Sequence, residues 1–204
     1  MLYNIHPETP QLRKVKQVVD VLKSGGVIIY PTDSVYALGC DFANADAVDK
    51  ICKLRGLDPT KANLTFICKN ISQVAEYTAQ MNNETFRLMK RNLPGPFTFI
   101  LKSNNSVPKM FKNKKRTVGV RIPKNNIVSE IVEHLGRPIL SASLKSGEEI
   151  SEYFTDPKLI QENYENRVDA IIDGGIGNHD PSTVVDCTGD EPLLVRSGIK
   201  DLRL

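Results

Sequence analysis

The segment Val27-Ile28-Ile29-Tyr30 constrains the fold of this chain more than any other stretch of its sequence. Its four residues are apolar and three of them are β-branched, without the alternation of polar and apolar residues that marks a half-exposed strand. A strand of this kind is buried on both faces. The chain therefore needs a sheet with helices packed against it.

Helix-like and strand-like segments alternate along the rest of the chain. Apolar residues at helical spacing predict helices over residues 11–24, 44–54, 72–79, 83–92, 127–135 and 157–164. Short apolar runs predict strands over residues 26–31, 64–68, 97–102, 117–123, 137–143, 168–173, 182–188 and 192–198. Because the last three strands follow one another closely, we expect an α/β fold with a mixed sheet that contains antiparallel pairs.

The length and hydrophobic content suit one domain over residues 1–204. With 204 residues, of which 40% are hydrophobic, the chain can bury a core, and neither a linker nor an internal repeat divides it. It has no run of eighteen apolar residues, and Pro and Glu interrupt the N-terminal segment MLYNIHPETP where a signal peptide needs an apolar stretch. These features predict a soluble, cytoplasmic protein with no membrane partner.

The cysteines predict neither a metal site nor a disulfide scaffold. Cys40, Cys52, Cys68 and Cys187 lack CxxC spacing and a neighbouring histidine, so we expect reduced, mostly buried thiols. The motifs GxxxxGK[ST], GxGxxG, HExxH and GxSxG do not occur either. Any chemistry would then rest on positioning and on charge stabilisation. His134 falls near a helix end, where a solvated or capping role is favoured over a general base.

Hydroxyl groups and arginines cluster at predicted strand ends. Thr32, Asp33 and Ser34 follow the first buried strand, at the place where α/β sheets open their ligand crevice. A turn that uses these residues for local hydrogen bonds is an equally good interpretation. Other strand ends strengthen the ligand interpretation, because they carry the same chemistry: Ser141, Ser143 and Ser182 as hydroxyls, and Arg121 and Arg196 as guanidiniums.

Two cationic segments have alternative interpretations. Lys53 and Arg55 either complement the dipole of the helix that ends there or, because Gly56 stops that helix, converge on one anion. The run KMFKNKKR at 109–116 holds five cations in eight residues. It is either a solvated loop or a surface for RNA or nucleotide phosphates, with Lys112, Lys114 and Lys115 as the candidate RNA contacts.

These segments together resemble a known family. GGVIIYPTDSVYALGCD, KLR, PGPFTFIL, TVGVRIP, SAS, PSTVVD and VRSG occur in the order and spacing of YrdC-like proteins, from about residue 10 to the end. The resemblance implies a twisted α/β fold with a basic central cavity. It also implies nucleotidyltransferase activity of the threonylcarbamoyl-AMP synthase type, in which L-threonine, bicarbonate and ATP, with Mg²⁺, give threonylcarbamoyl-AMP and pyrophosphate. That product serves t6A modification at position 37 of tRNA.

The resemblance also implies roles for individual residues. Thr32 and Ser182 match positions at the threonyl end, and Lys53 and Arg55 match the K-x-R pair that neutralises carboxylate and phosphate charge. Four residues match adenylate-binding positions: Arg121, Ser141, Ser143 and Arg196.

Two departures from the synthase pattern resemble the YciO-like branch. Gly56 stands where synthases have proline, and Ser143 stands where they have an asparagine, so an amide is replaced by a hydroxyl with fewer hydrogen-bonding groups. An alternative function is therefore binding of double-stranded RNA, tRNA or ribosomes with little or no synthase activity.

Overall fold

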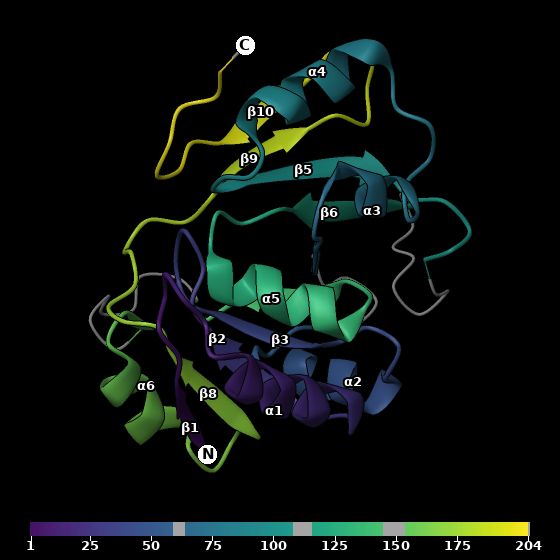
Figure 1. Ribbon diagram of the computed structural model, residues 1–204. Helices are drawn as coiled ribbons and strands as arrows, with labels where there is room; N and C mark the ends of the chain where they lie inside the picture. Colours follow the sequence, from purple (N-terminus) through teal and green to yellow (C-terminus); the bar gives the residue numbers. More distant parts are fainter. Residues whose placement is uncertain (59–63, 108–115, 145–153, 204) are drawn as a thin grey trace.

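The computed structural model describes residues 1–58, 64–107, 116–144 and 154–203, which form ten strands and six helices (Figure 1). The strands are β1 (Leu2–Asn4), β2 (Val27–Tyr30), β3 (Ala37–Asp41), β4 (Thr65–Ile67), β5 (Phe97–Lys102), β6 (Thr117–Arg121), β7 (Ile139–Ser143), β8 (Ala170–Asp173), β9 (Thr183–Asp186) and β10 (Leu193–Arg196). The helices are α1 (Leu12–Lys23), α2 (Ala45–Leu54), α3 (Ile71–Ala75), α4 (Asn83–Asn92), α5 (Asn126–Leu135) and α6 (Pro157–Tyr164).

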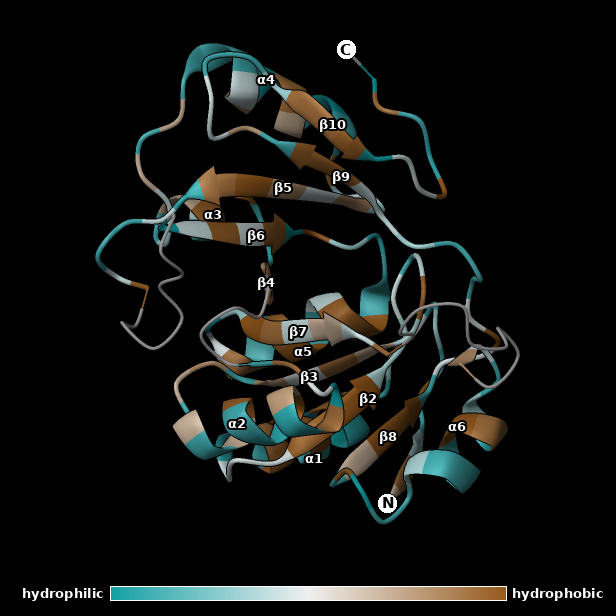
Figure 2. Cartoon of the chain, turned by 180° about the vertical axis from the view of Figure 1, so that it is seen from behind, coloured by the Kyte–Doolittle hydropathy of each residue, from teal (hydrophilic) through white to brown (hydrophobic). Residues whose placement is uncertain are grey.

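All ten strands belong to one twisted mixed sheet in the order β1-β8-β2-β3-β7-β4-β6-β5-β9-β10. Five neighbouring pairs are antiparallel and four are parallel. The expected mixed α/β architecture is therefore confirmed. In Figure 2 the short strand β4 lies between a lower half, with β7, β3, β2 and β8, and an upper half, with β6, β5, β9 and β10.

Strand β2 is buried on both faces, as its apolar run predicts. Val27 and Ile29 belong to one hydrophobic cluster, and Ile28 and Tyr30 belong to another. All four residues have no exposed surface. The first cluster contains core residues of α2 and α4, such as Ile51 and Met89, and we call this side of the sheet the α2/α4 face.

The opposite side of the sheet, the α1/α5 face, is covered by helices over only part of its width. Its cluster joins core residues of α1 and α5 to strand residues from β2, β3, β4, β7 and β8. No residue of β5, β6, β9 or β10 belongs to that cluster among the described residues. The upper half of this face is therefore left for other contacts.

The helix boundaries follow the capping residues that the sequence supplies. The side chains of Asn44, Asn70, Asn82 and Asn125 each accept a hydrogen bond from a backbone N–H in the first helical turn. Gly136, with φ of +75°, ends α5 in the left-handed conformation that glycine adopts easily. Capping chemistry is local in sequence, so these ends were open to prediction.

Three elements differ from expectation. Strand β3 was not predicted, because Gly39 and Asp41 interrupt its short apolar run, although all five of its residues are buried. Strand β1 was not predicted, because it has only three residues and its outer two are exposed, so it carries no alternating pattern. It is held by parallel pairing with β8. Helix α3 is shorter than the predicted 72–79, because residues after Ala75 turn toward β5, where Thr78 forms an isolated bridge with Ser103.

The structure also shows where the cysteines and the exposed apolar residues lie. Cys40, Cys52 and Cys68 are free and buried, and Cys187 is free and half-buried. None of the helices in the described part of the chain has the length and apolar content needed to span a lipid bilayer. Strand β10 is an edge strand whose Leu193, Leu194 and Val195 are at least half exposed.

Asp169 joins three separate elements at one carboxylate. It accepts hydrogen bonds from the backbone N–H of Val27 at 2.7 Å and from Lys50 Nζ at 2.8 Å. Partial burial alone would raise the pKa of Asp169, but these hydrogen bonds and the positive charge of Lys50 lower it below its ordinary value. A depressed pKa in the folded state means that the carboxylate stabilises the fold above its unfolded pKa of about 4 and loses that effect as the pH falls.

We therefore predict that Asp169→Asn lowers the free energy of unfolding by about 1 kcal/mol at neutral pH, a modest value because the side chain is 43% exposed. The difference from the wild-type protein should vanish as the pH falls below the depressed pKa. Urea denaturation across this pH range measures it. Asp190→Asn, at an exposed aspartate, is the control and should show no such trend. A constant difference at every pH would contradict the assignment.

Candidate functional site

Strand register places three of the predicted site residues on the α1/α5 face. Ser141 of β7 pairs with Thr65 of β4, and Thr65 pairs in turn with Gly119 of β6. Side chains two positions apart in a strand point to the same face. Arg121 and Ser143, two residues after Gly119 and Ser141, therefore share this face with Ser141.

Arg196 joins the same face from the far end of the sheet. It pairs with Val184 of β9, and Val184 also pairs with Thr98 of β5. Thr98 faces the same side as Gly119, since a Cβ atom added to Gly119 would lie 3.0 Å from Thr65 Oγ1 and 3.5 Å from Thr98 Cγ2. The upper half of the α1/α5 face therefore carries polar residues such as Thr98, Arg121 and Arg196 beside the apolar Ile100 and Val184, whereas the lower half carries an apolar core.

Arg121 is bound to the turn that follows β2. Its Nη2 donates to the Asp33 carboxylate at 2.5 Å, to Ser34 Oγ at 2.9 Å and to Thr32 Oγ1 at 3.3 Å. The other Asp33 oxygen accepts a hydrogen bond from the backbone N–H of Lys124 at 2.8 Å. The side chains of Arg121 and Asp33 are each only 9% exposed, so this is a buried ion pair.

The turn itself combines the two interpretations that its sequence left open. The Thr32 hydroxyl donates to the Val35 carbonyl at 2.8 Å and accepts from the backbone N–H of Ser34 at 3.0 Å, which are local turn contacts. Yet the same hydroxyl and its neighbours hold an arginine from a distant strand. The turn is therefore both a local hydrogen-bonded structure and the anchor of a buried cation.

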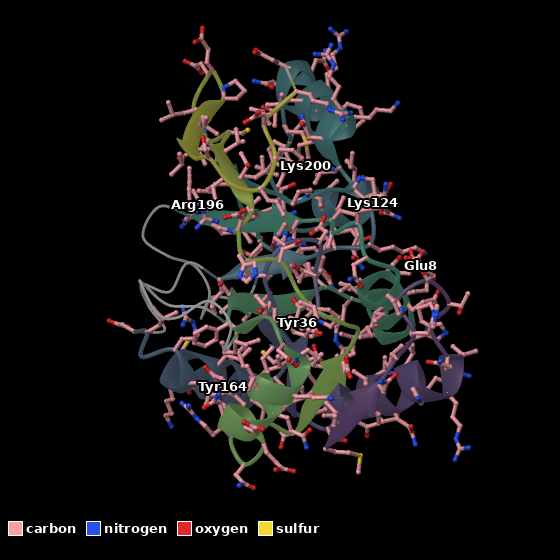
Figure 3. All side chains as sticks on the ribbon, turned by 90° about the vertical axis from the view of Figure 1, so that its left-hand side faces the viewer. Glu8, Tyr36, Lys124, Tyr164, Arg196 and Lys200 are labelled. Atoms are coloured by element: carbon pink, nitrogen blue, oxygen red, sulfur yellow. The ribbon has the colours of Figure 1, made fainter. Side chains whose placement is uncertain are left out.

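A second segment, between β8 and β9, packs on the outside of this turn. The Tyr36 hydroxyl donates to the Gly175 carbonyl at 2.7 Å, and the backbone N–H of Asn178 donates to the Ser34 carbonyl at 3.3 Å. In Figure 3, which views the molecule from the side of this segment, Arg196 lies above Tyr36 and toward the upper half. The segment ends at Ser182, so it joins the turn to the Arg196 side of the site.

Arg196 and Ser182 form the other part of the site. The Arg196 guanidinium donates to the Ser182 carbonyl from Nε at 3.2 Å and from Nη2 at 2.7 Å. The Ser182 hydroxyl lies 2.9 Å from Thr98 Oγ1. Gly198, in the VRSG segment, has no room for a side chain, because an added Cβ would lie 2.4 Å from the Pro181 carbonyl oxygen. The VRSG and PSTVVD segments are therefore in direct contact.

The two arginines act on each other electrostatically. Burial, and after it the positive charge of Arg121, lowers the pKa of Arg196. Arg121 Nε is also buried and has no hydrogen-bond partner among the described residues. Two neighbouring guanidiniums with an unused buried donor favour an anionic ligand, which would supply the missing acceptor and reduce the repulsion.

Ser141 has a structural role that the sequence did not reveal. It accepts a hydrogen bond from the Tyr30 hydroxyl at 2.6 Å and donates to the Leu38 carbonyl at 3.1 Å. Burial raises the pKa of Tyr30, which keeps its hydroxyl protonated and available as a donor. The proton of Ser141 is thus engaged within the protein, and any ligand contact would use a remaining lone pair.

Lys53 and Arg55 lie at the end of α2, as predicted. Gly56 has φ of +60°, and the backbone N–H groups of Gly56 and Leu57 donate to the carbonyls of Lys53 and Cys52, which is the Schellman arrangement. Arg55 is half-buried and its Nη1 donates to the Leu144 carbonyl at 3.3 Å, next to Ser143. Lys53 is exposed. The pair is therefore divided between the protein interior and solvent.

Some predicted features fall outside these contacts. Lys112, Lys114 and Lys115 lie outside the described residues. Two hollows of the structure border other residues, and the basic central cavity stays a prediction. Within the described ranges, no group of three or more His, Cys, Asp or Glu side chains is arranged to hold a metal ion. The ion pair of Asp33 with Arg121 was not predicted. The one available signal was the place of Asp33 in PTDS, between the candidate residue Thr32 and Ser34.

Comparison with known proteins gives consistent matches over nearly the whole chain. Residues 20–198 match the family model Sua5_yciO_yrdC, described as "Telomere recombination". A protein of Escherichia coli (strain K12), described as "Uncharacterized protein YciO", is 43% identical over an alignment of 203 residues that covers 98% of this chain and 97% of the relative.

Two solved structures extend these matches to the fold. The crystal structure of E. coli YciO has a TM-score of 0.92 at 41% identity and covers 100% of this chain and 98% of its own. P. abyssi Sua5, solved in complex with L-threonine, has a TM-score of 0.87 at 28% identity and covers 97% of this chain. This chain spans only 57% of that Sua5 chain.

The buried pair between Arg121 and Asp33 leads to a stability prediction. Asp33→Ala would leave the Arg121 charge buried without its carboxylate, and we expect a loss of about 3–5 kcal/mol in the free energy of unfolding. Urea denaturation measures this loss. Asp20→Ala, at an exposed aspartate of α1, is the matched control and should change stability by no more than about 0.5 kcal/mol. Equal effects of the two substitutions would show that the ion pair does not hold the turn.

Proposed function

Because this chain belongs to the Sua5/YciO/YrdC family, we propose that it binds L-threonine, bicarbonate and ATP and joins them into threonylcarbamoyl-AMP, with release of pyrophosphate. The observation that carries this proposal is that Arg121 and Arg196 lie close enough on one face of the sheet to affect each other electrostatically. The buried Nε of Arg121 also lacks a hydrogen-bond partner among the described residues. ATP, bicarbonate and both products are anions. The L-threonine complex of P. abyssi Sua5 supports the choice of amino acid.

The proposed site divides into two ends. Arg121, Arg196, Ser141 and Ser143 form the adenylate end, and Thr32 and Ser182 form the threonyl end. The hydroxyls of Thr32 and Ser182 already have protein partners, so these residues act mainly by shaping the pocket and holding the two arginines. Arg55, on the side of the site next to Leu144, and Lys53 neutralise carboxylate and phosphate charge.

The reaction needs charge stabilisation more than proton transfer. The amino group of threonine combines with bicarbonate to give a carbamate and water. A carbamate oxygen then attacks the α-phosphorus of ATP, and the bond between the α-phosphorus and the bridging oxygen breaks as pyrophosphate leaves. The guanidiniums hold the negative charge that gathers on the phosphates, and the fixed sheet holds the two reactants in line.

Magnesium enters this proposal as part of the nucleotide substrate. The described residues offer no cluster of carboxylates, histidines or thiols for an ion of its own, so the triphosphate oxygens would carry it. Bound in this way, it screens the triphosphate and assists the departure of pyrophosphate. The product would then serve t6A modification at position 37 of tRNA, the role that the family resemblance suggests.

Measuring pyrophosphate release in the presence of threonine, bicarbonate, ATP and Mg²⁺ tests the proposal. Arg196→Ala should lower the rate by about 100-fold or more, because it removes a donor from the developing phosphate charge. Lys53→Ala and Arg55→Ala should lower it as well. Arg13→Ala, at an exposed arginine of α1, is the control and should leave it unchanged. Activity that is equal in all four variants would place the site elsewhere, and no pyrophosphate from the wild-type protein would refute the synthase function.

A second candidate function rests on the cationic run at 109–116 together with Gly56 and Ser143, which depart from the synthase pattern. In this alternative the protein binds double-stranded RNA, tRNA or ribosomes through phosphate contacts, with little or no synthase activity. Contacts between lysines and phosphates release counterions, so such binding weakens steeply with salt.

For this alternative we predict that RNA affinity falls with salt, and that charge reversal at Lys112, Lys114 and Lys115 weakens binding. The same change should reduce the salt dependence by about one unit of slope for each phosphate that the variant no longer binds. Titrating a labelled tRNA with the protein at several salt concentrations measures both effects. Charge reversal at Lys14, Lys16 and Lys23 of α1 is a control with the same change in net charge. Equal weakening in both triple variants would indicate a general charge effect and contradict this surface.

A further inference from the structure

A hollow of about 880 Å³ is lined by the start of α3, the segment 78–81 and α4. Figure 1 shows α3 on the right-hand side of the molecule and α4 at its top. The apolar lining of the hollow includes Met81, Phe86, Leu93, Pro94 and Ile122. None of the eight residues predicted for the synthase site lines it. Its volume falls within the range of about 300–1,000 Å³ that is typical of small-molecule sites.

Helix α4 has an exposed aromatic residue outside the side that packs against the sheet. Thr85, Leu88, Met89 and Asn92 are its buried residues and form the side that packs against the sheet. Phe86 lies outside this set, is 42% exposed and lines the hollow. An exposed phenylalanine next to other apolar residues in a concave surface is typical of a binding site rather than of a solvated helix face.

The charged residues that line the hollow are all cationic. Lys69 and Lys90 contribute to the lining, and no aspartate or glutamate does. Lys69 forms an ion pair with Glu133 of α5. The Lys90 side chain has no ion-pair or hydrogen-bond partner within the described part of the chain. Lys90 lies four residues after Phe86 and therefore on the same side of the helix. An aromatic ring and an exposed ammonium group thus lie next to each other at this hollow.

From these observations we propose that the hollow binds a small organic anion with an aromatic or aliphatic body and one carboxylate, sulfonate or phosphate group. The body packs against Phe86, Met81 and Ile122, and the anionic group lies near Lys90. Polar residues of the lining, such as Ser72 and Gln80, supply orienting hydrogen bonds. This site does not depend on the proposed synthase function.

A pair of dyes that differ in one charged group tests the proposal. Anilinonaphthalene sulfonate has an aromatic body and one sulfonate, and phenylnaphthylamine has the same kind of body without the charge. Both fluoresce when they leave water. The sulfonate dye should bind the folded protein saturably, with one site per chain, and more tightly than the neutral dye.

Substitutions on α4 separate the charge from the apolar contact. Lys90→Glu should weaken the sulfonate dye by about tenfold, equivalent to about 1.4 kcal/mol, and leave the neutral dye unchanged. Arg87→Glu makes the same change of charge at an exposed residue of α4 that does not line the hollow, and it should have little effect. Phe86→Ser should weaken both dyes, whereas Leu12→Ser, which removes an exposed leucine from α1, should weaken neither.

Thermal unfolding of each variant verifies that it is folded at the temperature of the titration. Saturable binding with the expected pattern supports the site. The proposal is wrong if neither dye binds the wild-type protein, if Lys90→Glu and Arg87→Glu weaken the sulfonate dye equally, or if Phe86→Ser has no effect. An acidic peptide that binds at Lys90 when both dyes fail would replace the small anion with a protein partner.

Discussion

The ion pair between Arg121 and Asp33 is the interaction on which the arrangement of the site depends. Arg121 ends β6 and Asp33 follows β2, and three strands lie between β2 and β6 in the sheet. In a flat sheet these two strands would be about 19 Å apart, at about 4.8 Å for each of four spacings. Contact between the two residues therefore requires a sheet that curves toward the α1/α5 face, together with a turn that reaches across it. One buried charge thus links the lower half of the molecule to the upper half.

Most of the fold was open to prediction because its signals are local. The apolar run at Val27–Tyr30 predicted a strand with helices packed on both of its faces. Asn44 and Gly56 predicted the two ends of one helix through capping chemistry. Strands β1 and β3 were not predicted. The three residues of β1 lie at a sheet edge and carry no period, and the pairing partner β8 comes some 170 residues later. Gly39 and Asp41 interrupt the apolar run of β3. The order of the strands depends on such distant pairings, which no local pattern specifies.

For the candidate site, the residue types were open to prediction, but their contacts were not. Residue types were visible, and strand register brings Arg121, Ser141 and Arg196 to one face, as a shared site requires. What each group contacts was not visible. Ser141 accepts a hydrogen bond from Tyr30, and the Asp33 carboxylate accepts one from Arg121. Both contacts join residues about 90 to 110 positions apart, so the sequence did not indicate them. A side chain's partner in a folded protein depends on long-range packing, which a sequence motif does not encode.

Arg196 lies on the edge strand β10, which would link the proposed ligand site to the attachment of that strand. This strand has four residues and one neighbouring strand, and its apolar side chains are largely in solvent. Its attachment therefore rests on the pairing with β9 and on the hydrogen bonds from Arg196 to Ser182. Local detachment of β10 would carry the Arg196 guanidinium away from the proposed site. A ligand that engages this guanidinium binds only the attached state and by mass action keeps the strand in place. Fraying at the edge of the sheet and occupancy of the site are therefore two sides of a single equilibrium.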